Sequence, residues 1–185
     1  MFNVNDIKNG MTIKYEGVIY QVVEFQHVKP GKGSAFVKTK LKNLRAGTTQ
    51  EITFNAGIKM EKADVRKNQL SYLYAAGDNY VFMDNNTYEQ IPLNEEQIGD
   101  ALKYMKENMD MKILSYKGKV FAVEPPMFVE LEVTYTEPGF SGNTTTTSGK
   151  PAKLENGLEI SVPLFVEIGD KIRIDTRTGE YMERV

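Results

Sequence analysis

The sequence predicts an all-β protein built from three small β modules. Its dominant hydrophobic period is two residues, the period of a strand with one buried face. Glycine-containing turns separate the alternating segments at short intervals, as in successive β-hairpins. Hydrophobic residues make up 41% of the 185 residues. The sequence has no long glycine- or proline-rich tract, which argues against disorder.

The first module is expected to span residues 1–64. Alternating segments predict four strands, at residues 11–15, 18–25, 35–41 and 50–54. Glu16-Gly17 predicts a turn between the first two strands, and residues 45–48 predict a turn between the last two. Phe36 shares its parity with the lysines that follow it, so we expect the third strand to twist, to bulge or to be half exposed.

The second module is expected to span residues 65–126. Its predicted strands lie at residues 65–74, 80–83, 88–91, 111–116 and 120–124. One short helix is predicted at about residues 94–104, because Asn94 is a suitable N-cap and two glutamates follow it. Pro125-Pro126 then marks a boundary, since consecutive prolines cannot continue a sheet ladder.

The third module is expected to span residues 127–185. Strands are predicted at residues 128–135, 158–162, 171–175 and 180–185, with a polar loop over residues 139–150. Small five-stranded barrels of the OB type fit the second and third modules. Modules of this size bury little core alone, so contacts between domains should contribute to stability.

The amino-acid composition argues against several classes of function for this protein. Cysteine is absent, which excludes disulfides, thiolate metal sites and cysteine nucleophiles and suits a reducing cytoplasm. The single histidine, His27, is interpreted as structural, and scattered carboxylates form no obvious catalytic pair or metal site. We therefore expect no enzyme activity, no cofactor and no metal. No segment resembles a signal peptide or an apolar run of about 18 residues, so no membrane partner is expected.

Charge is distributed unevenly along the chain. Residues 1–64 hold ten Lys/Arg against six Asp/Glu, while residues 127–185 hold six against ten. A stretch without acids carries the basic excess, at Lys29, Lys32, Lys38, Lys40, Lys42 and Arg45. Lys38, Lys40, Lys42 and Arg45 form a candidate RNA-facing patch, because alternating cations on a hairpin attract a polyanion. A solvated edge strand protected by lysines explains the same pattern equally well.

One turn of the first module presents a lysine at its tip. Pro30 and Gly31 predict a tight turn, and Gly33 frees the chain on the other side of Lys32. The whole candidate tip loop comprises Lys29, Pro30, Gly31, Lys32, Gly33 and Ser34. An ammonium on a long stem can reach a deep polyanionic site and is accessible to a modifying enzyme. The alternative is an ordinary solvated turn lysine, and the spacing of a P-loop is missing.

Two spaced motifs resemble those of the bacterial elongation factor P family. The first is Val-Lys-Pro-Gly-Lys-Gly-x-Ala-Phe at residues 28–36. The second is Lys-x-Ala-x4-Gly-x2-Ile-x-Val-Pro-x2-Val-x2-Gly at residues 150–169, and the ending at residues 175–181 is also similar. Because the motifs lie at both ends of the chain and are in register, the resemblance covers the whole chain.

The resemblance implies a specific architecture and role. It implies a KOW/SH3-like N-terminal barrel followed by two OB barrels, in an L-shaped arrangement that mimics tRNA. The factor would act as a monomer in the cytoplasm and bind the ribosome between the P and E sites. Lys32 would carry a post-translational extension, added by a modifying enzyme, toward the CCA end of the P-site peptidyl-tRNA. The factor would stimulate peptide-bond formation and relieve stalling at consecutive prolines, while the ribosome remains the catalyst.

A second candidate contact lies in the third module. The resemblance places a loop near the E-site mRNA codon, and the corresponding residues are Gly142, Asn143, Thr144, Thr145 and Lys150. Many family members have an aspartate and further glycines there, whereas this chain has Asn143 and a threonine run. A flexible polar loop is the alternative. Tyr181 and Arg184 could touch tRNA, although such residues also close barrels.

Two other interpretations stay open at the level of sequence. A generic OB-fold RNA-binding protein would combine aromatic and basic residues on one sheet face, but the OB-like modules here are acidic. An elongation-factor-P-like paralogue is the second, and the intact Lys32 tip counts against it. The shorter archaeal and eukaryotic factor with a hypusine at its tip lacks a counterpart of residues 127–185.

Overall fold

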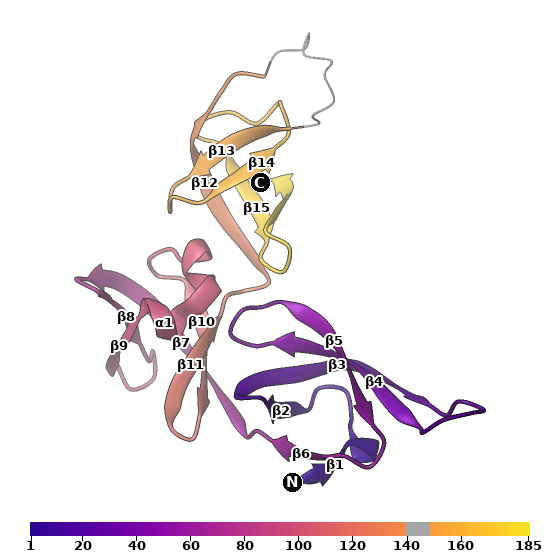
Figure 1. The fold of residues 1–185 in the computed structure, drawn as a ribbon. Helices are drawn as coiled ribbons and strands as arrows, with labels where there is room; N and C mark the ends of the chain where they lie inside the picture. The colour runs from indigo at the N-terminus through magenta and orange to yellow at the C-terminus, as the bar shows by residue number, and fades with distance from the viewer. Residues whose placement is uncertain (140–148) are drawn as a thin grey trace. The chain divides into compact units, whose positions relative to one another are not determined.

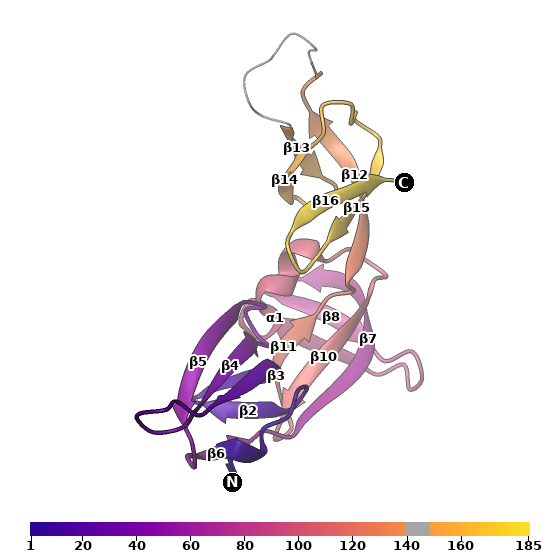
Figure 2. The ribbon, with the colours of Figure 1, turned by 90° about the vertical axis from the view of Figure 1, so that its right-hand side faces the viewer.

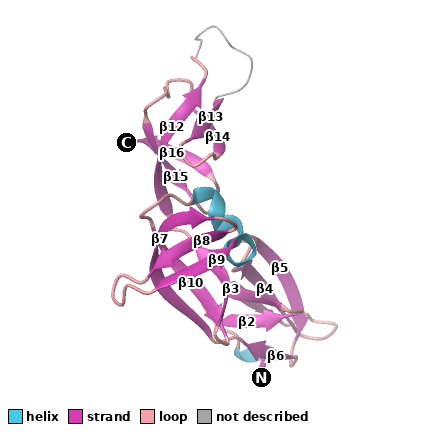
Figure 3. Cartoon of the chain, turned by 90° about the vertical axis from the view of Figure 1, so that its left-hand side faces the viewer, coloured by secondary structure: helices cyan, strands magenta, loops and turns pink. Residues whose placement is uncertain are grey.

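The computed structural model describes residues 1–139 and 149–185, and its strands form three β-sheets (Figure 1). Helix is confined to short segments (Figure 3). The all-β prediction is therefore confirmed. The chain divides into two compact units, one made of residues 1–68, 94–100 and 113–124 and the other of residues 69–93, 101–112 and 125–185. The domain boundaries expected after residues 64 and 126 stay a prediction.

The first sheet has six strands in the order β1-β6-β2-β3-β4-β5. These are β1 (Phe2–Asn3), β2 (Thr12–Tyr15), β3 (Val18–Val28), β4 (Phe36–Asn43), β5 (Thr49–Asn55) and β6 (Lys59–Lys62), with the 3-10 turn η1 at Val4–Asp6. Two short strands, β1 and β6, were not predicted, because two to four residues give too little alternation to detect. Glu16 and Gly17 both have positive φ, at 49° and 79°, which confirms the tight turn between β2 and β3.

A bulge in β3 sets which side chains face the first core. The register against β4 shifts between Val22 and Glu24, which leaves Val23 exposed. Beyond the bulge, Phe25 pairs with Thr39 and packs against the core cluster that includes Val37 and Leu41. The lysine strand β4 is itself half exposed, as one of the alternatives predicts, and the bulge lies in its partner β3.

The second sheet has five strands in the order β11-β10-β7-β8-β9. They are β7 (Val65–Ala76), β8 (Asn79–Met83), β9 (Gln90–Asn94), β10 (Asp110–Tyr116) and β11 (Lys119–Glu124), with α1 at Glu95–Ile98 and the 3-10 segment η2 at Gly99–Tyr104. Asn94 forms a capping box with Gln97, which confirms the predicted helix start. The α-helix ends after one turn because Gly99, at φ +68°, leaves the helical conformation.

The third sheet has five strands in the order β14-β13-β12-β15-β16 (Figure 2). They are β12 (Phe128–Thr136), β13 (Lys150–Leu154), β14 (Glu159–Val162), β15 (Lys171–Asp175) and β16 (Glu180–Arg184). Along β12, Val129, Leu131 and Val133 are buried while Glu130 and Glu132 are exposed, as the alternation predicts. Strand β13 was not predicted, and its first residue, Lys150, was expected at the end of the polar loop over residues 139–150.

Candidate functional site

The predicted tip loop joins β3 to β4 and projects beyond the rest of the first sheet (Figures 1 and 2). The last ladder pair is Val28 with Phe36, so seven residues, 29–35, make the connection. Lys32 stands at the midpoint, four residues from either member of that pair. Gly33 has φ +101°, a conformation that disfavours any side chain and so favours glycine at this position.

Lys32 is exposed and so are Gly31, Gly33 and Ser34 around it. Within residues 1–139 and 149–185, the Lys32 side chain makes no hydrogen bond or ion pair. The loop is tied at its base, where the amide of Ala56 donates to the carbonyl of Ala35 at 3.0 Å. The geometry therefore presents a free primary ammonium on a loop whose own residues place little bulk beside it.

Rings support the strand that leads into the loop. Phe25 and His27 lie edge to face with their centroids 5.4 Å apart, and His27 pairs across the ladder with Val37. Val37 is fully buried. His27 thus contacts the ring of Phe25 but is itself exposed, and its interpretation as a structural residue stays a prediction.

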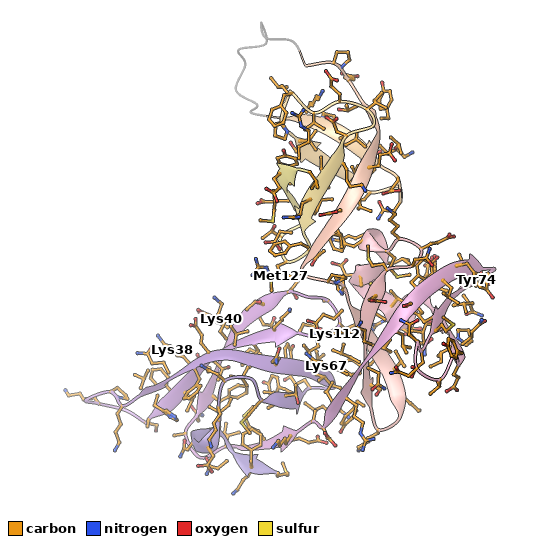
Figure 4. All side chains as sticks on the ribbon, turned by 180° about the vertical axis from the view of Figure 1, so that it is seen from behind. Lys38, Lys40, Lys67, Tyr74, Lys112 and Met127 are labelled. Atoms are coloured by element: carbon orange, nitrogen blue, oxygen red, sulfur yellow. The ribbon has the colours of Figure 1, made fainter. Side chains whose placement is uncertain are left out.

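The candidate basic patch follows one face of β4 but is not uniform. The side chains of Val37, Thr39 and Leu41 point inward. The alternate residues Lys38, Lys40 and Lys42 therefore point outward, and Figure 4 shows Lys38 and Lys40 as neighbours along the strand. Each lysine has cross-strand partners on the same face. Lys38 lies between Gln26 and Thr53, Lys40 between Glu24 and Glu51, and Lys42 between Gln21 and Thr49.

These partners change the electrostatics expected from the sequence. Lys40 lies opposite two glutamates and its Nζ is 3.8 Å from Glu24 Oε1, so its charge is largely balanced locally. Lys38 has only neutral partners across the ladder and is exposed. Of the three lysines, Lys38 therefore has the charge most available to an external polyanion.

Arg45, the fourth residue of the candidate patch, is held by other parts of the protein. Its guanidinium donates to the carbonyl of Glu96 at 2.7 Å and lies 3.9 Å from the Glu96 carboxylate. The neighbouring Leu44 is 8% exposed and packs with Leu114 and Ala122. No local pattern predicts these contacts, because Arg45 and Glu96 are 51 positions apart. Contact of Arg45 with RNA stays a prediction.

The candidate codon-contact loop lies mostly outside the described residues. Gly142, Asn143, Thr144 and Thr145 belong to residues 140–148, which lie outside the described residues. Lys150 is described, and it is 8% exposed. Its ammonium donates to the backbone carbonyl of Glu137, which gives the charge a partner inside the protein.

The C-terminal candidates differ from each other in exposure. Tyr181 is partly buried and packs against the third core. Arg184 lies over the ring of Phe165, with 5.1 Å between the guanidinium carbon and the centroid, and 3.6 Å from Asp170. Both therefore contribute to the packing of the third sheet, and a tRNA contact by either stays a prediction.

A tight ion pair stabilises the turn before β16. Arg177 donates to both carboxylate oxygens of Asp175, at 3.1 and 2.8 Å. These hydrogen bonds hold the pKa of the Asp175 carboxyl below its usual range, since they favour its ionised form. The same pair raises the pKa of Arg177.

Two features are absent from the part of the chain that the structure describes. Among residues 1–139 and 149–185, no three or more His, Asp or Glu side chains gather as they would to hold a metal ion. No helix in the same ranges is long and apolar enough to cross a membrane.

Comparison with known proteins places the three sheets in one family. The family model for the elongation factor P KOW-like domain matches residues 3–60, the model for its OB domain matches residues 65–123, and the model for its C-terminal domain matches residues 129–184. Each model thus covers most of one sheet.

Full-length relatives agree with the family models. Proteins named elongation factor P from Acetivibrio thermocellus, Ruminiclostridium cellulolyticum and Caldicellulosiruptor saccharolyticus are 61%, 60% and 57% identical over 185 residues. In each comparison the match covers 100% of both chains. A solved structure of a translation initiation factor 5A from Methanococcus jannaschii, 23% identical with a TM-score of 0.47, covers 66% of this chain and 92% of its own. The three family models and the three relatives that match over their full length show that the chain belongs to the elongation factor P family.

Proposed function

We propose that this chain is a translation elongation factor that binds the ribosome between the P and E sites and places Lys32 near the CCA end of the P-site peptidyl-tRNA. One observation carries the proposal, which is the exposed and unpaired Lys32 at the midpoint of a projecting loop. The full-length match to proteins named elongation factor P supports it. In this role the factor works in the cytoplasm as a monomer.

The proposed mechanism is positional. Proline reacts slowly as a peptide acceptor, because its ring restricts the backbone and the amine. A cation inserted beside the CCA end would attract the tRNA phosphates and limit the conformations of the peptidyl-tRNA. Orienting reactants lowers the entropic part of a barrier without any covalent step by the factor. The ribosome thus forms the peptide bond, and this chain stimulates the step at consecutive prolines.

Lys32 is also the proposed substrate of a modifying enzyme. Its ammonium has open space around it, because the flanking glycines place no side chain there. An extension of the side chain would lengthen the reach of the amine without disturbing a packed surface. Contact of residues 142–145 with the E-site codon is a further part of the proposal and rests on the family resemblance. Lys150, which is 8% exposed and donates to the carbonyl of Glu137, would support the base of that loop.

Reconstituted translation of a reporter with three consecutive prolines tests the proposal. The natively modified protein should relieve the stall, and Lys32→Ala should return the rate to that measured without the factor. Lys32→Arg keeps the charge but removes the primary amine, so its failure would show that the amine or its extension is needed. The matched control is Lys59→Ala, which removes an exposed lysine of β6 in the same sheet.

Intact-mass measurement of the natively expressed protein reports any extension on Lys32. If fully modified protein bound ribosomes and left the stall unchanged, the proposal would be wrong. Strong binding to bare single-stranded RNA, combined with that failure, would instead support a generic RNA-binding module.

A further inference from the structure

A second cationic site lies within the unit that carries the tip loop, where the β10–β11 turn approaches the segment joining β6 to β7 (Figures 1 and 2). A shallow depression of about 670 Å³ is found there, and we call it the Tyr116 basin. The residues that carry the argument are Lys62, Asp64, Arg66, Tyr116 and Lys117 in its lining, with Lys14 beside them.

The ring of Tyr116 lies close to two of the ammonium groups. Lys14 Nζ lies 5.5 Å and Lys117 Nζ lies 5.3 Å from the centroid of the Tyr116 ring. Lys117 takes a left-handed conformation, with φ 51°, at the turn that brings its side chain back over the ring. A ring attracts a cation through its quadrupole but carries no net charge. The ring therefore attracts both ammonium groups without neutralising them, and Lys14 also lies opposite Glu61 across the β2–β6 ladder.

The remaining charges of the basin are also unpaired. Within the described residues, no ion pair at or below 4.0 Å involves Lys14, Lys62, Arg66 or Lys117. By contrast, Lys67, the next residue after Arg66, lies 3.3 Å from Glu124. Two carboxylates, Glu61 and Asp64, share the lining, so four cations stand against two acids. The basin keeps an excess of two positive charges in a concave surface.

We propose that the Tyr116 basin binds the phosphate backbone of an RNA, at a place separate from the tip loop. Guanidinium and ammonium groups suit phosphate oxygens, and Arg66 can donate two parallel hydrogen bonds. The two carboxylates can accept from ribose 2′-hydroxyls, which RNA offers and an acidic protein surface does not. That this RNA is ribosomal rests on the proposed function.

Salt dependence of binding tests the electrostatic part. Binding to ribosomes carrying P-site tRNA is measured at several KCl concentrations for Lys117→Gln, Arg66→Gln, Asp64→Asn and the exposed control Lys59→Gln. Each basic variant should bind more weakly, with a plot of log K against log salt less steep by about one per lost phosphate contact. Asp64→Asn should bind more tightly, because it removes a charge that repels phosphate and keeps an amide oxygen that can accept from a 2′-hydroxyl. Equal affinities and slopes for all four would overturn the proposal.

A cross-link identifies the chemistry of the partner. A photoreactive benzophenone amino acid at Asn68, an exposed position in the basin lining, leaves the Tyr116 contacts intact. After irradiation on ribosomes, an adduct with RNA supports the proposal, whereas an adduct with protein alone, or none, overturns it.

The two proposals can fail separately. Unchanged stalling with the wild-type protein, together with an RNA adduct at Asn68, would reject the proposed function and keep the basin. Relief of stalling with no adduct, and with no effect of Arg66→Gln on the salt slope, would reject the basin alone. Thermal melting of each variant shows that it is folded before binding is compared.

Discussion

The two ends of β4 carry cationic residues in opposite situations. At one end the tip loop presents Lys32, which makes no hydrogen bond or ion pair within the described residues. At the other end Asn43 accepts from the amides of Arg45 and Ala46, and Gly47 donates to its carbonyl. The sequence shows a basic residue in a turn in both places. Only the contacts separate a group that is free to bind from one that fastens two parts of the chain together.

The difference has a simple physical basis. Leu44 packs in a cluster with Leu114 and Ala122, so its burial anchors the turn independently of the charge of Arg45. The tip loop offers no comparable anchor, because its side chains from Lys29 to Ser34 are polar, small or exposed. A fixed turn suits structural support, and an unanchored loop suits insertion into a partner.

The largest effect should come from Leu44→Ala. The substitution removes buried methyl groups and leaves a cavity, so we expect a loss of about 2–4 kcal/mol in the free energy of unfolding. Urea denaturation measures it. Val23→Ala is a control, since Val23 is 43% exposed, and it should cost far less. Equal losses for the two variants would remove the distinction between the buried turn and the rest of the sheet.

Gly99→Ala should come next. Gly99 has φ +68° and ψ −143°, a conformation open almost only to glycine. An added Cβ would lie 3.2 Å from the carbonyl oxygen of Arg45. We expect a cost of about 1–3 kcal/mol by denaturation. The comparison is Gly118→Ala, also at positive φ but with nothing near its Cβ, which should cost less.

Arg45→Ala should have a smaller effect, about 0.5–1.5 kcal/mol, because a hydrogen bond to a carbonyl is lost while the partly exposed ion pair contributes little. Glu96→Ala is the informative companion. It removes the weak ion pair but keeps the backbone acceptor, so it should cost less than Arg45→Ala. A larger cost for Glu96→Ala would mean that the carboxylate, and not the carbonyl, holds the turn.

A second arginine with partners inside the protein, Arg177, leads to a prediction about how stability depends on pH. Its hydrogen bonds lower the pKa of Asp175 in the folded protein, so the stability that this pair contributes is present above the pKa of the unfolded state and is lost as pH falls through the folded-state pKa. The melting temperature of the wild type should therefore fall more on acidification than that of Asp175→Asn. Parallel curves would show that the pair contributes no pH dependence.

Lys32→Ala should have the smallest effect on stability, within about 0.5 kcal/mol, since the substitution lies on an exposed position without partners. The same variant should show the largest loss in the polyproline assay. A clear drop in melting temperature would indicate that the loop is packed in solution, and it would weaken the contrast between the two ends of β4.

Local sequence patterns predicted the fold well, but they could not predict side-chain contacts between residues far apart in the chain. The alternation along β12 and the cap at Asn94 depend on neighbours in the chain, and both are present in the structure. The partner of Arg45 lies 51 positions away, and no local period reports such a contact. Lys150 illustrates the same limit, since its hydrogen bond to Glu137 replaces an expected exposed charge with a buried one.

The symmetry of the tip loop has a consequence for loop length. Lys32 is four residues from each end of the Val28–Phe36 pair, so its Cα can stand at most about 14 Å beyond that pair, at roughly 3.3–3.6 Å per residue. Adding one residue on each side would move this ceiling outward by only about 3.5 Å, whereas adding one residue on a single side would turn the lysine off the axis of the hairpin. The number of residues on either side of Lys32 therefore limits how far the lysine can extend into a binding partner.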